Sequence, residues 1–369
     1  MVEEALVPFN DLSRSIKIHR KEIDKAITAV LDSGWFVLGP QHEALEFELS
    51  QFLGVNHAVN VGNGTDALEL ALAALGVTEG SVVLTVANAG AYTTTAALLL
   101  GAEPVYVDVD PETLLMSAET LSAALAMIDK KPAAIVVTHL YGAVAPMTEI
   151  LAVASRHGIP VLEDCAQSFG ASLEGRQSGS FADISTTSFY PTKNLGALGD
   201  GGAVFTNNEA LAEKVRRMRQ YGWASKYSIE HSHGKNSRLD EIQAAILRVK
   251  LPHLLASNSK RKEIHKSYEQ SGISSARFVN TASESFNAHL AVIISSSRAS
   301  LRDSLRGYGI PTEIHYPISD NKQQFPEFTP RSMPLDVTEW ASGQVLSLPM
   351  FPELTAAEVD KVVSALSKH

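Results

Sequence analysis

Short runs of β-branched residues alternate with Ala/Leu-rich stretches between about residues 57 and 206. The stretches between the first five runs, such as TDALELALAALG and MTEILAVASRHG, are helix-like. This alternation predicts βα units around a buried, largely parallel sheet. A long turn-rich loop joins the last two runs, so one strand there can be antiparallel. The predicted strands are residues 57–61, 82–86, 104–107, 134–138, 160–163, 184–189 and 202–206.

The pattern changes after residue 207, where longer charged helices follow and Pro252 interrupts the second of them. A proline inside a helix costs about 3 kcal/mol or more, so we expect the chain to bend there and begin a second unit. Residues 288–294 are strand-like, and two amphipathic helical segments follow. We therefore predict an α/β protein with a large domain over residues 1–250, including an N-terminal segment lying across it, and a small α+β domain over residues 251–369.

Composition narrows the class of protein. The 369 residues are 45% hydrophobic and 20% charged, as in ordinary globular proteins, and the net charge of −10 disfavours binding to nucleic acid or anionic membranes. A single cysteine, Cys165, and a start without a basic, apolar leader favour a cytoplasmic location. No apolar stretch approaches the roughly 20 residues that span a bilayer. An anionic ligand would therefore have to be bound by locally concentrated donors.

A glycine-rich turn follows the first predicted strand, in VNVGNGTDALELAL (59–72). With Gly62 and Gly64 in the turn and a helix opening at Thr65 and Asp66, backbone N–H groups and a helix dipole converge as a phosphate requires. An ordinary βα turn with Thr or Asp as the helix cap explains the pattern equally well. The spacing matches neither a Walker A loop nor GxGxxG.

A second candidate site ends the fifth predicted strand, in VLEDCAQSFGA (161–171). Asp164 lies where open α/β sheets bind their ligands, and Gln167 follows three residues later. Cys165 could be a nucleophile, but a lone cysteine in an apolar strand is more often a small core residue. His139 also follows a strand, which favours a position in the pocket.

A third candidate is Lys193, in the loop PTKNLGALGDGG between the last two predicted strands. A lysine is usually solvated. This one has apolar flanks, glycines around it and no acidic residue within six positions. Partial desolvation would lower its basicity and make it an amine nucleophile.

The three segments together match the contacts that pyridoxal 5'-phosphate needs. Its phosphate needs N–H donors, its pyridine nitrogen needs an anion, and its aldehyde needs an amine. The ordered combination is stronger evidence than any one segment.

The same residues resemble the DegT/StrS-type pyridoxal-phosphate-dependent sugar aminotransferases of fold type I. The resemblance covers nearly the whole chain, and its most specific stretches are SFYPTKNLGALGDGGAVFTNN and NSRLDEIQAAILRVKL. It implies a mostly parallel sheet with helices on both faces. It also implies that Lys193 links covalently to the cofactor and moves the proton, that Asp164 pairs with the pyridine nitrogen and that Gln167 contacts the ring hydroxyl.

The resemblance also implies how the phosphate and substrate are held. Ser188 and the amides of Gly64 and Thr65 would bind the phosphate, and Asn236 would reach the phosphate of a neighbouring subunit, which makes the active unit a homodimer. The nucleotide diphosphate would contact Lys226, Tyr227 and Arg238; a solvated basic turn and an ion pair between Arg238 and Asp240 are the alternative. One departure stands out: where many relatives have an aromatic side chain on the cofactor ring, this chain has Gly90, with Tyr92 two residues on. Either Tyr92 stacks on the ring from a shifted loop or the ring is covered differently.

The form FYPTKNLGALGDGG is most similar to enzymes that aminate carbon 3 of a dTDP-linked 3-keto-6-deoxyhexose, with L-glutamate as donor and 2-oxoglutarate as product. Relatives acting on carbon 4 more often have histidine in place of Tyr190, a candidate substrate contact. A non-catalytic cofactor-binding regulator is the rival hypothesis, although the chain has no separate DNA-binding helical module. We expect no metal site, because His231 and His233 have no further evident ligands.

Overall fold

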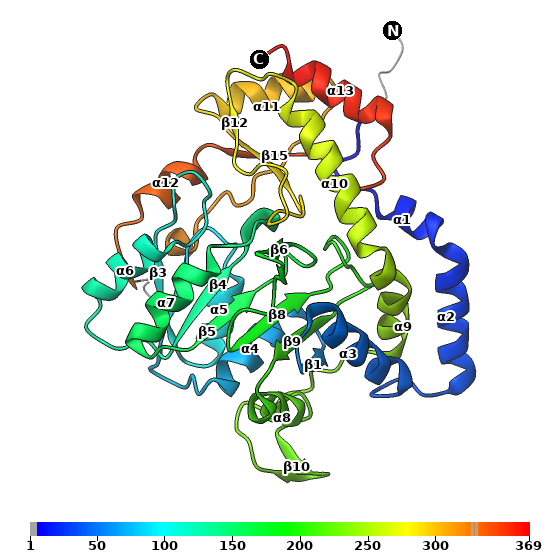
Figure 1. Cartoon of the computed structure of the whole chain (residues 1–369), viewed down its shortest axis with the longest axis vertical. Helices are drawn as coiled ribbons and strands as arrows, with labels where there is room; N and C mark the ends of the chain where they lie inside the picture. Colours follow the sequence, from blue (N-terminus) through cyan, green and yellow to red (C-terminus); the bar gives the residue numbers. More distant parts are fainter. Residues whose placement is uncertain (1–5, 326–327, 329–330) are drawn as a thin grey trace.

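The computed structural model describes residues 6–325, 328 and 331–369, and is built around an eight-stranded sheet (Figure 1). Among the described strands of this sheet, only β9 runs antiparallel to its neighbours, as the sequence allowed for one of the last two strands. The short edge strand β14, which pairs parallel to β3, was not expected. The strand order is β1 (His57–Val61), β9 (Gly202–Thr206), β8 (Ile184–Ser188), β5 (Val161–Asp164), β4 (Ala134–Thr138), β2 (Val82–Val86), β3 (Glu103–Val107) and β14 (Arg331–Ser332).

Helices cover both faces of the sheet because the central strands are apolar on both sides. In β2, Val83 packs in the core beneath one layer of helices, while Val82 and Leu84 face the other layer. The first layer contains α4 (Gly64–Ala74), α5 (Tyr92–Leu99) and α8 (Glu209–Met218). The opposite layer contains α3 (Pro40–Leu53), α6 (Ala118–Met127), α7 (Met147–His157) and α9 (Glu241–Lys250).

The C-terminal part packs at one end of this sandwich (Figure 1). A 3₁₀ turn, Leu251–His253, separates α9 from α10 at the position of Pro252. One apolar core runs from the α6 and α7 layer into the C-terminal part, so the domain boundary at residue 250 stays a prediction. This part contains the sheet β12 (Arg277–Phe278), β13 (Ala291–Ile294) and β15 (Val345–Leu348), with α10 (Leu254–Glu269), α11 (Arg298–Gly307), α12 (Asp336–Ser342) and α13 (Ala356–Leu366).

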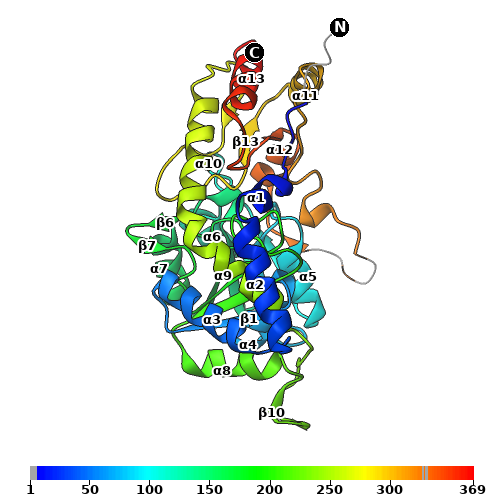
Figure 2. The ribbon, with the colours of Figure 1, turned by 90° about the vertical axis from the view of Figure 1, so that its right-hand side faces the viewer.

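The N-terminal helices α1 (Leu12–Ile18) and α2 (Arg20–Ser33) run along one side of the molecule (Figure 2). The helix α2 packs on α9, as expected for a segment lying across the large domain. Arg14 of α1 also reaches the C-terminal part, where its guanidinium donates two hydrogen bonds of 2.7 Å to the Glu358 carboxylate. The N-terminal segment therefore contacts both parts of the chain.

The largest difference in a strand boundary lies in the C-terminal part. The strand expected over residues 288–294 begins only at Ala291, because Ala288 adopts a left-handed backbone conformation with φ +52°. Two small hairpins were also not expected, β6 (Ser172–Leu173) with β7 (Arg176–Gln177) and β10 (Trp223–Ser225) with β11 (Ser228–Ile229). No helix in the described ranges combines the length and apolarity that crossing a bilayer would require.

Candidate active site

A cavity of about 490 Å³ lies where β5 and β8 end, beside the first turn of α4. This is the edge of the sheet at which α/β folds bind ligands. The cavity brings together residues from all three segments that the sequence singled out. Its wall includes Gly64, Thr65, Asp164, Gln167, Ser188, Tyr190 and Lys193.

The first turn of α4 and the end of β8 form an anion cradle. Asn63 is the helix cap, in place of the expected Thr65 or Asp66, and its Oδ1 accepts a hydrogen bond from the Asp66 amide. The preceding amides, of Gly64 and Thr65, have no partner within the helix. A Cβ atom at Gly64 would lie 2.6 Å from Cβ of Ser188, so the close approach of these two residues requires glycine. The Ser188 hydroxyl, which accepts from the Tyr190 amide, keeps its own proton to donate.

Asp164 and Lys193 supply the opposite charges of the site. Asp164 is 7% exposed, and its burial raises the pKa of the carboxyl, against the Ala166 amide and the charge of Lys193. Burial likewise lowers the pKa of Lys193 to about 8, and the negative charge of Asp164 opposes that shift. A lysine with this pKa has a substantial free-amine fraction near neutral pH, as a nucleophile needs.

Gln167 and two tyrosines form another wall. The Gln167 Oε1 atom accepts a 2.6 Å hydrogen bond from the Tyr141 amide, and its Nε2 donates to the Tyr316 hydroxyl at 3.1 Å. A Cβ at Gly90 would lie 2.9 Å from the Tyr316 ring, so this ring already fills the space beside position 90. Tyr92 meets Tyr316 edge to face, and both line the cavity. The C-terminal part thus supplies an aromatic surface that was not foreseen in the sequence.

Four predicted residues lie outside this cavity. Asn236 is exposed, next to Ser237, which accepts a hydrogen bond from the Gly62 amide. Lys226 and Tyr227 join β10 to β11 in a hairpin that projects from the body of the protein (Figure 1). The guanidinium of Arg238 lies 5.9 Å from the centre of the Tyr221 ring. The alternative ion pair between Arg238 and Asp240 does not form among the described residues.

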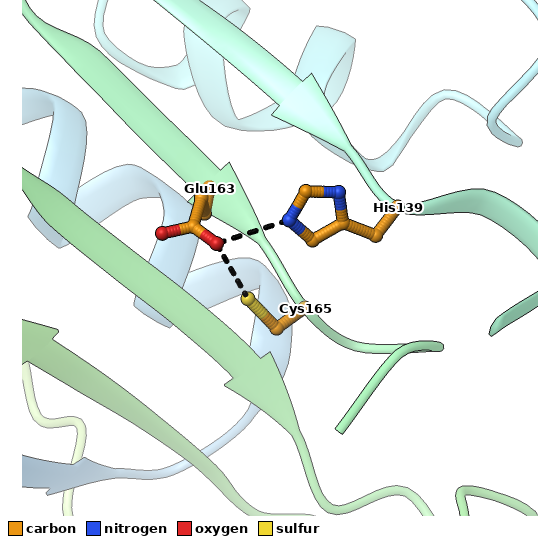
Figure 3. Close-up of side chains that lie close together, drawn as sticks. All are labelled: His139, Glu163 and Cys165. Carbon is orange, nitrogen blue, oxygen red and sulfur yellow. Dashed lines mark hydrogen bonds and ion pairs between the residues drawn. The ribbon is translucent and has the colours of Figure 1, made fainter. Parts of the chain in front are cut away.

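His139 does not line the cavity, which corrects the sequence interpretation. It points instead at Glu163, together with Cys165 (Figure 3). The His139 Nδ1 atom accepts from the Ala145 amide, so its Nε2 carries the proton and donates to Glu163 at 3.0 Å. Side chains alternate along β5, so Glu163 and Asp164 point to opposite faces, and His139 lies on the Glu163 side, away from the cavity.

Hydrogen bonds account for this buried cluster. Besides His139, the Glu163 carboxylate accepts bonds of 2.8–2.9 Å from the amides of residues 179, 181 and 182, which ties that loop to β5. Burial acts to raise the pKa of Glu163, but these hydrogen bonds outweigh it and the pKa is lowered. Burial and the Glu163 charge raise the pKa of Cys165 well above its usual value. The cysteine thus stays a thiol, which favours its interpretation as a core residue.

A polar network behind Lys193 was missed in the sequence. Asn194 donates through Nδ2 to Oδ1 of Asn258 at 2.7 Å, so its own Oδ1 faces Nδ1 of His289 at 2.8 Å. His289 lines the cavity, and its pKa is lowered well below the usual value by burial and by the nearby Lys193 charge. Only the position of Asn194, directly after Lys193, could have suggested that its side chain belongs to a network at the active site.

The donor set fits pyridoxal phosphate. The cradle at α4 suits its phosphate, the buried carboxylate of Asp164 suits its pyridine nitrogen, and the amine of Lys193 suits its aldehyde. All three lie in one cavity, as the cofactor requires.

The comparisons agree with this chemistry. The model of the DegT/DnrJ/EryC1/StrS aminotransferase family matches residues 17–367. A UDP-2-acetamido-2-deoxy-3-oxo-D-glucuronate aminotransferase from Pseudomonas aeruginosa is 39% identical, covering 98% of this chain and 100% of that protein. A dTDP-3-amino-3,4,6-trideoxy-alpha-D-glucose transaminase from Streptomyces venezuelae is 37% identical, and the match covers 99% of this chain and 96% of that protein. The crystal structure of NtdA from Bacillus subtilis with bound cofactor PMP has a TM-score of 0.91 and 32% identity, covering 99% of this chain and 85% of that chain.

Proposed function

Because the chain belongs to the DegT/DnrJ/EryC1/StrS aminotransferase family, it is a pyridoxal-phosphate-dependent nucleotide-sugar aminotransferase, and we propose that it aminates carbon 3 of the sugar. The proposed substrate is a dTDP-linked 3-keto-6-deoxyhexose, with L-glutamate as amino donor and 2-oxoglutarate as the released keto acid. Carbon 3 is supported by the names of two relatives, which specify 3-oxo and 3-amino sugars. Those names carry different nucleotides, so the dTDP group depends on the loop motif around Lys193.

The observation that carries the proposal is the placement of Lys193 and Asp164 in the cavity that contains the anion cradle. The bound cofactor supplies an electron sink for a carbanion at the amino-bearing carbon. Asp164 would hold the pyridine nitrogen protonated, and Lys193 would hold the aldehyde and move the proton. Gln167, whose Oε1 is held by the Tyr141 amide, would orient the cofactor ring through a hydrogen bond from its Nε2 to the ring hydroxyl.

The phosphate end needs its own donors because the protein is negatively charged overall. Ser188 and the amides of Gly64 and Thr65 would bind the phosphate with charge-assisted hydrogen bonds, each worth about 1.5–3 kcal/mol. Tyr190, 53% exposed at the rim, would contact the sugar.

A second subunit would complete the site. Among the described residues, the cavity wall includes Lys193 but no arginine, although a nucleotide diphosphate needs cationic donors. Lys226, Tyr227, Arg238 and Asn236 lie outside this chain's own cavity, as donors to a neighbouring copy would. We expect a homodimer in which these residues reach the partner's site.

Mixing two inactive variants tests this sharing. Lys193→Ala and Asn236→Ala, unfolded and refolded together, should regain about a quarter of the wild-type turnover, because half of the dimers then contain one intact site. Each variant refolded alone is the control. Turnover that stays at the sum of the two variants would show that each subunit carries a complete site.

The reaction is tested with purified protein, pyridoxal phosphate and L-glutamate. Each reaction receives one dTDP- or UDP-linked sugar with its ketone at carbon 3 or carbon 4, and NMR identifies the carbon that gains nitrogen. The proposal expects a 3-amino sugar and no turnover by Lys193→Ala. Amination at carbon 4 would overturn the regiochemistry. A cofactor absorbance that L-glutamate does not change would favour the cofactor-binding regulator instead.

A further inference from the structure

A second, smaller cavity of about 60 Å³ lies beside the loop that carries Lys193. Four parts of the chain line it: α1, the loop of residues 191–198, the junction of α9 with α10, and residues 351–353. Asn10, Thr192 and Lys193 line both this cavity and the active-site cavity. A group bound here would therefore touch the segment that positions the active-site lysine.

The wall of this cavity contains a buried arginine for which the described residues supply no ion-pair partner. Arg261, on α10, is 5% exposed. Of the five N–H donors of a guanidinium, its Nη1 donates to the Met350 carbonyl oxygen at 3.0 Å, and its Nε has no hydrogen-bond partner among the described residues. Burial lowers the pKa of Arg261 to about 10. At neutral pH the side chain nevertheless stays protonated, so a positive charge is buried here with no ion pair to any residue in the described ranges.

A second cation faces the same space. Lys250 ends α9, and its Nζ donates to the Gly196 carbonyl oxygen at 2.6 Å. Burial lowers the pKa of Lys250, against the charge of Glu353. The ring of His19 stacks on that of His253 at 4.5 Å, and burial lowers the pKa of His19, which disfavours a positive charge on that ring.

The carboxylates at the cavity do not balance these charges. Glu353 interacts electrostatically with both Arg261 and Lys250, but within the described part of the chain it forms no ion pair of 4.0 Å or less with either. Asp11 accepts hydrogen bonds from Ser13 and Arg14 and is thereby engaged elsewhere. Lys193 also lines the cavity, but it has the Asp164 charge nearby, so Arg261 and Lys250 are the two cations that share Glu353. An unpaired buried charge is costly.

We propose that this cavity binds a small monoanion, a halide or the carboxylate group of a short acid, between Arg261 and Lys250. The volume is several times the roughly 10–15 Å³ that one water molecule needs, yet too small for a sugar or nucleotide. The anion would accept hydrogen bonds from the Nη groups of Arg261, since its Nε is fully buried, and would join α10 to the loop that Lys250 already contacts at Gly196. It would therefore stabilise the segment carrying Lys193 without entering the active-site cavity.

Thermal unfolding of the holoenzyme at constant ionic strength tests this binding. Potassium gluconate, whose anion is too large for the cavity, is replaced stepwise by potassium chloride, potassium bromide or potassium acetate. We expect a saturable rise in unfolding temperature of about 2 °C or more with an anion that binds. A rise with the halides alone identifies a halide site, and a rise with acetate alone identifies a carboxylate site.

Three variants link the effect to this cavity. Arg261→Met and Lys250→Met should each lose the anion-dependent shift, while Lys260→Met, which removes an exposed charge next to Arg261, should keep it. Anomalous scattering from bromide-soaked wild-type crystals locates a halide directly, even if Arg261→Met does not fold. The proposal is overturned if no small anion shifts the wild-type transition relative to gluconate, or if both cavity variants retain the full shift.

Discussion

Replacing Gly64 by alanine tests the anion cradle by adding a single methyl group. The new Cβ would lie 2.6 Å from Cβ and 3.0 Å from Oγ of Ser188, both shorter than a normal contact. Because Ser188 belongs to the central strand β8, the first turn of α4 must move away from it. Overpacking of this kind costs about 1–3 kcal/mol. The displaced amide would also lose one charge-assisted hydrogen bond to a bound phosphate, worth about 1.5–3 kcal/mol.

We therefore expect Gly64→Ala to bind pyridoxal phosphate about 10- to 150-fold more weakly than the wild type. The dissociation constant is measured by titrating the apoprotein and following intrinsic fluorescence. Pyridoxal without its phosphate is the matched ligand, and its affinity should change little. Gly307→Ala is the matched variant, because Gly307 is also helical and a Cβ there meets nothing within 4 Å. Wild-type affinity in Gly64→Ala, or an equal loss for both ligands, would refute a phosphate site at this turn.

Three further predictions follow from the same structure. Tyr316→Ala should weaken pyridoxal phosphate binding about tenfold more than Tyr92→Ala, because Tyr316 contacts Gln167 whereas Tyr92 is 48% exposed. Equal losses of affinity in the fluorescence titration would contradict this difference. Asn194→Ala leaves buried groups of His289 and Asn258 unpaired, so denaturant unfolding should show a loss of about 1–3 kcal/mol, and unchanged stability would count against the network. Burial raises the pKa of Asp320 from 3.8 to about 7, so the folded protein holds that proton more tightly than the unfolded chain and loses stability as pH rises from about 4 to 7. Asp320→Asn should therefore gain stability relative to the wild type across that window, by at most about 1.4 kcal/mol per pH unit in the free energy of unfolding. A stability difference between the two proteins that does not change with pH would contradict the raised pKa of Asp320.

The layers of helices around a mostly parallel sheet could be predicted from the sequence because the signals of each element are local. Each central strand is a short β-branched run buried on both faces, and the boundaries of β1, β2 and β4 match the predicted runs. Lys193, Asp164 and the glycine turn were singled out by their ordered combination, because none of the three segments is decisive by itself, and their roles stay predictions. Their meeting in one cavity follows from the topology, which brings the ends of β5 and β8 beside α4.

The rest of the site depends on contacts between distant segments. Tyr316 and His289 reach the cavity from the C-terminal part, more than 90 residues beyond Lys193 in the chain. The expected position of His139 in the pocket was wrong, because this residue follows a strand as a pocket residue does but turns towards Glu163. Which way a residue turns after a strand depends on its partners, here the Ala145 amide and a buried carboxylate, and no periodicity in the sequence indicates them.

The covalent attachment of the cofactor is the most direct test of the account. The protein is saturated with pyridoxal phosphate, treated with sodium borohydride to fix any link between the aldehyde and an amine, and digested for mass spectrometry. The account predicts one modified residue, Lys193, and no modified peptide when L-glutamate is added before the reductant. A label on another lysine, or a label that L-glutamate leaves unchanged, would contradict the claim that Lys193 is the amine through which this protein transfers amino groups.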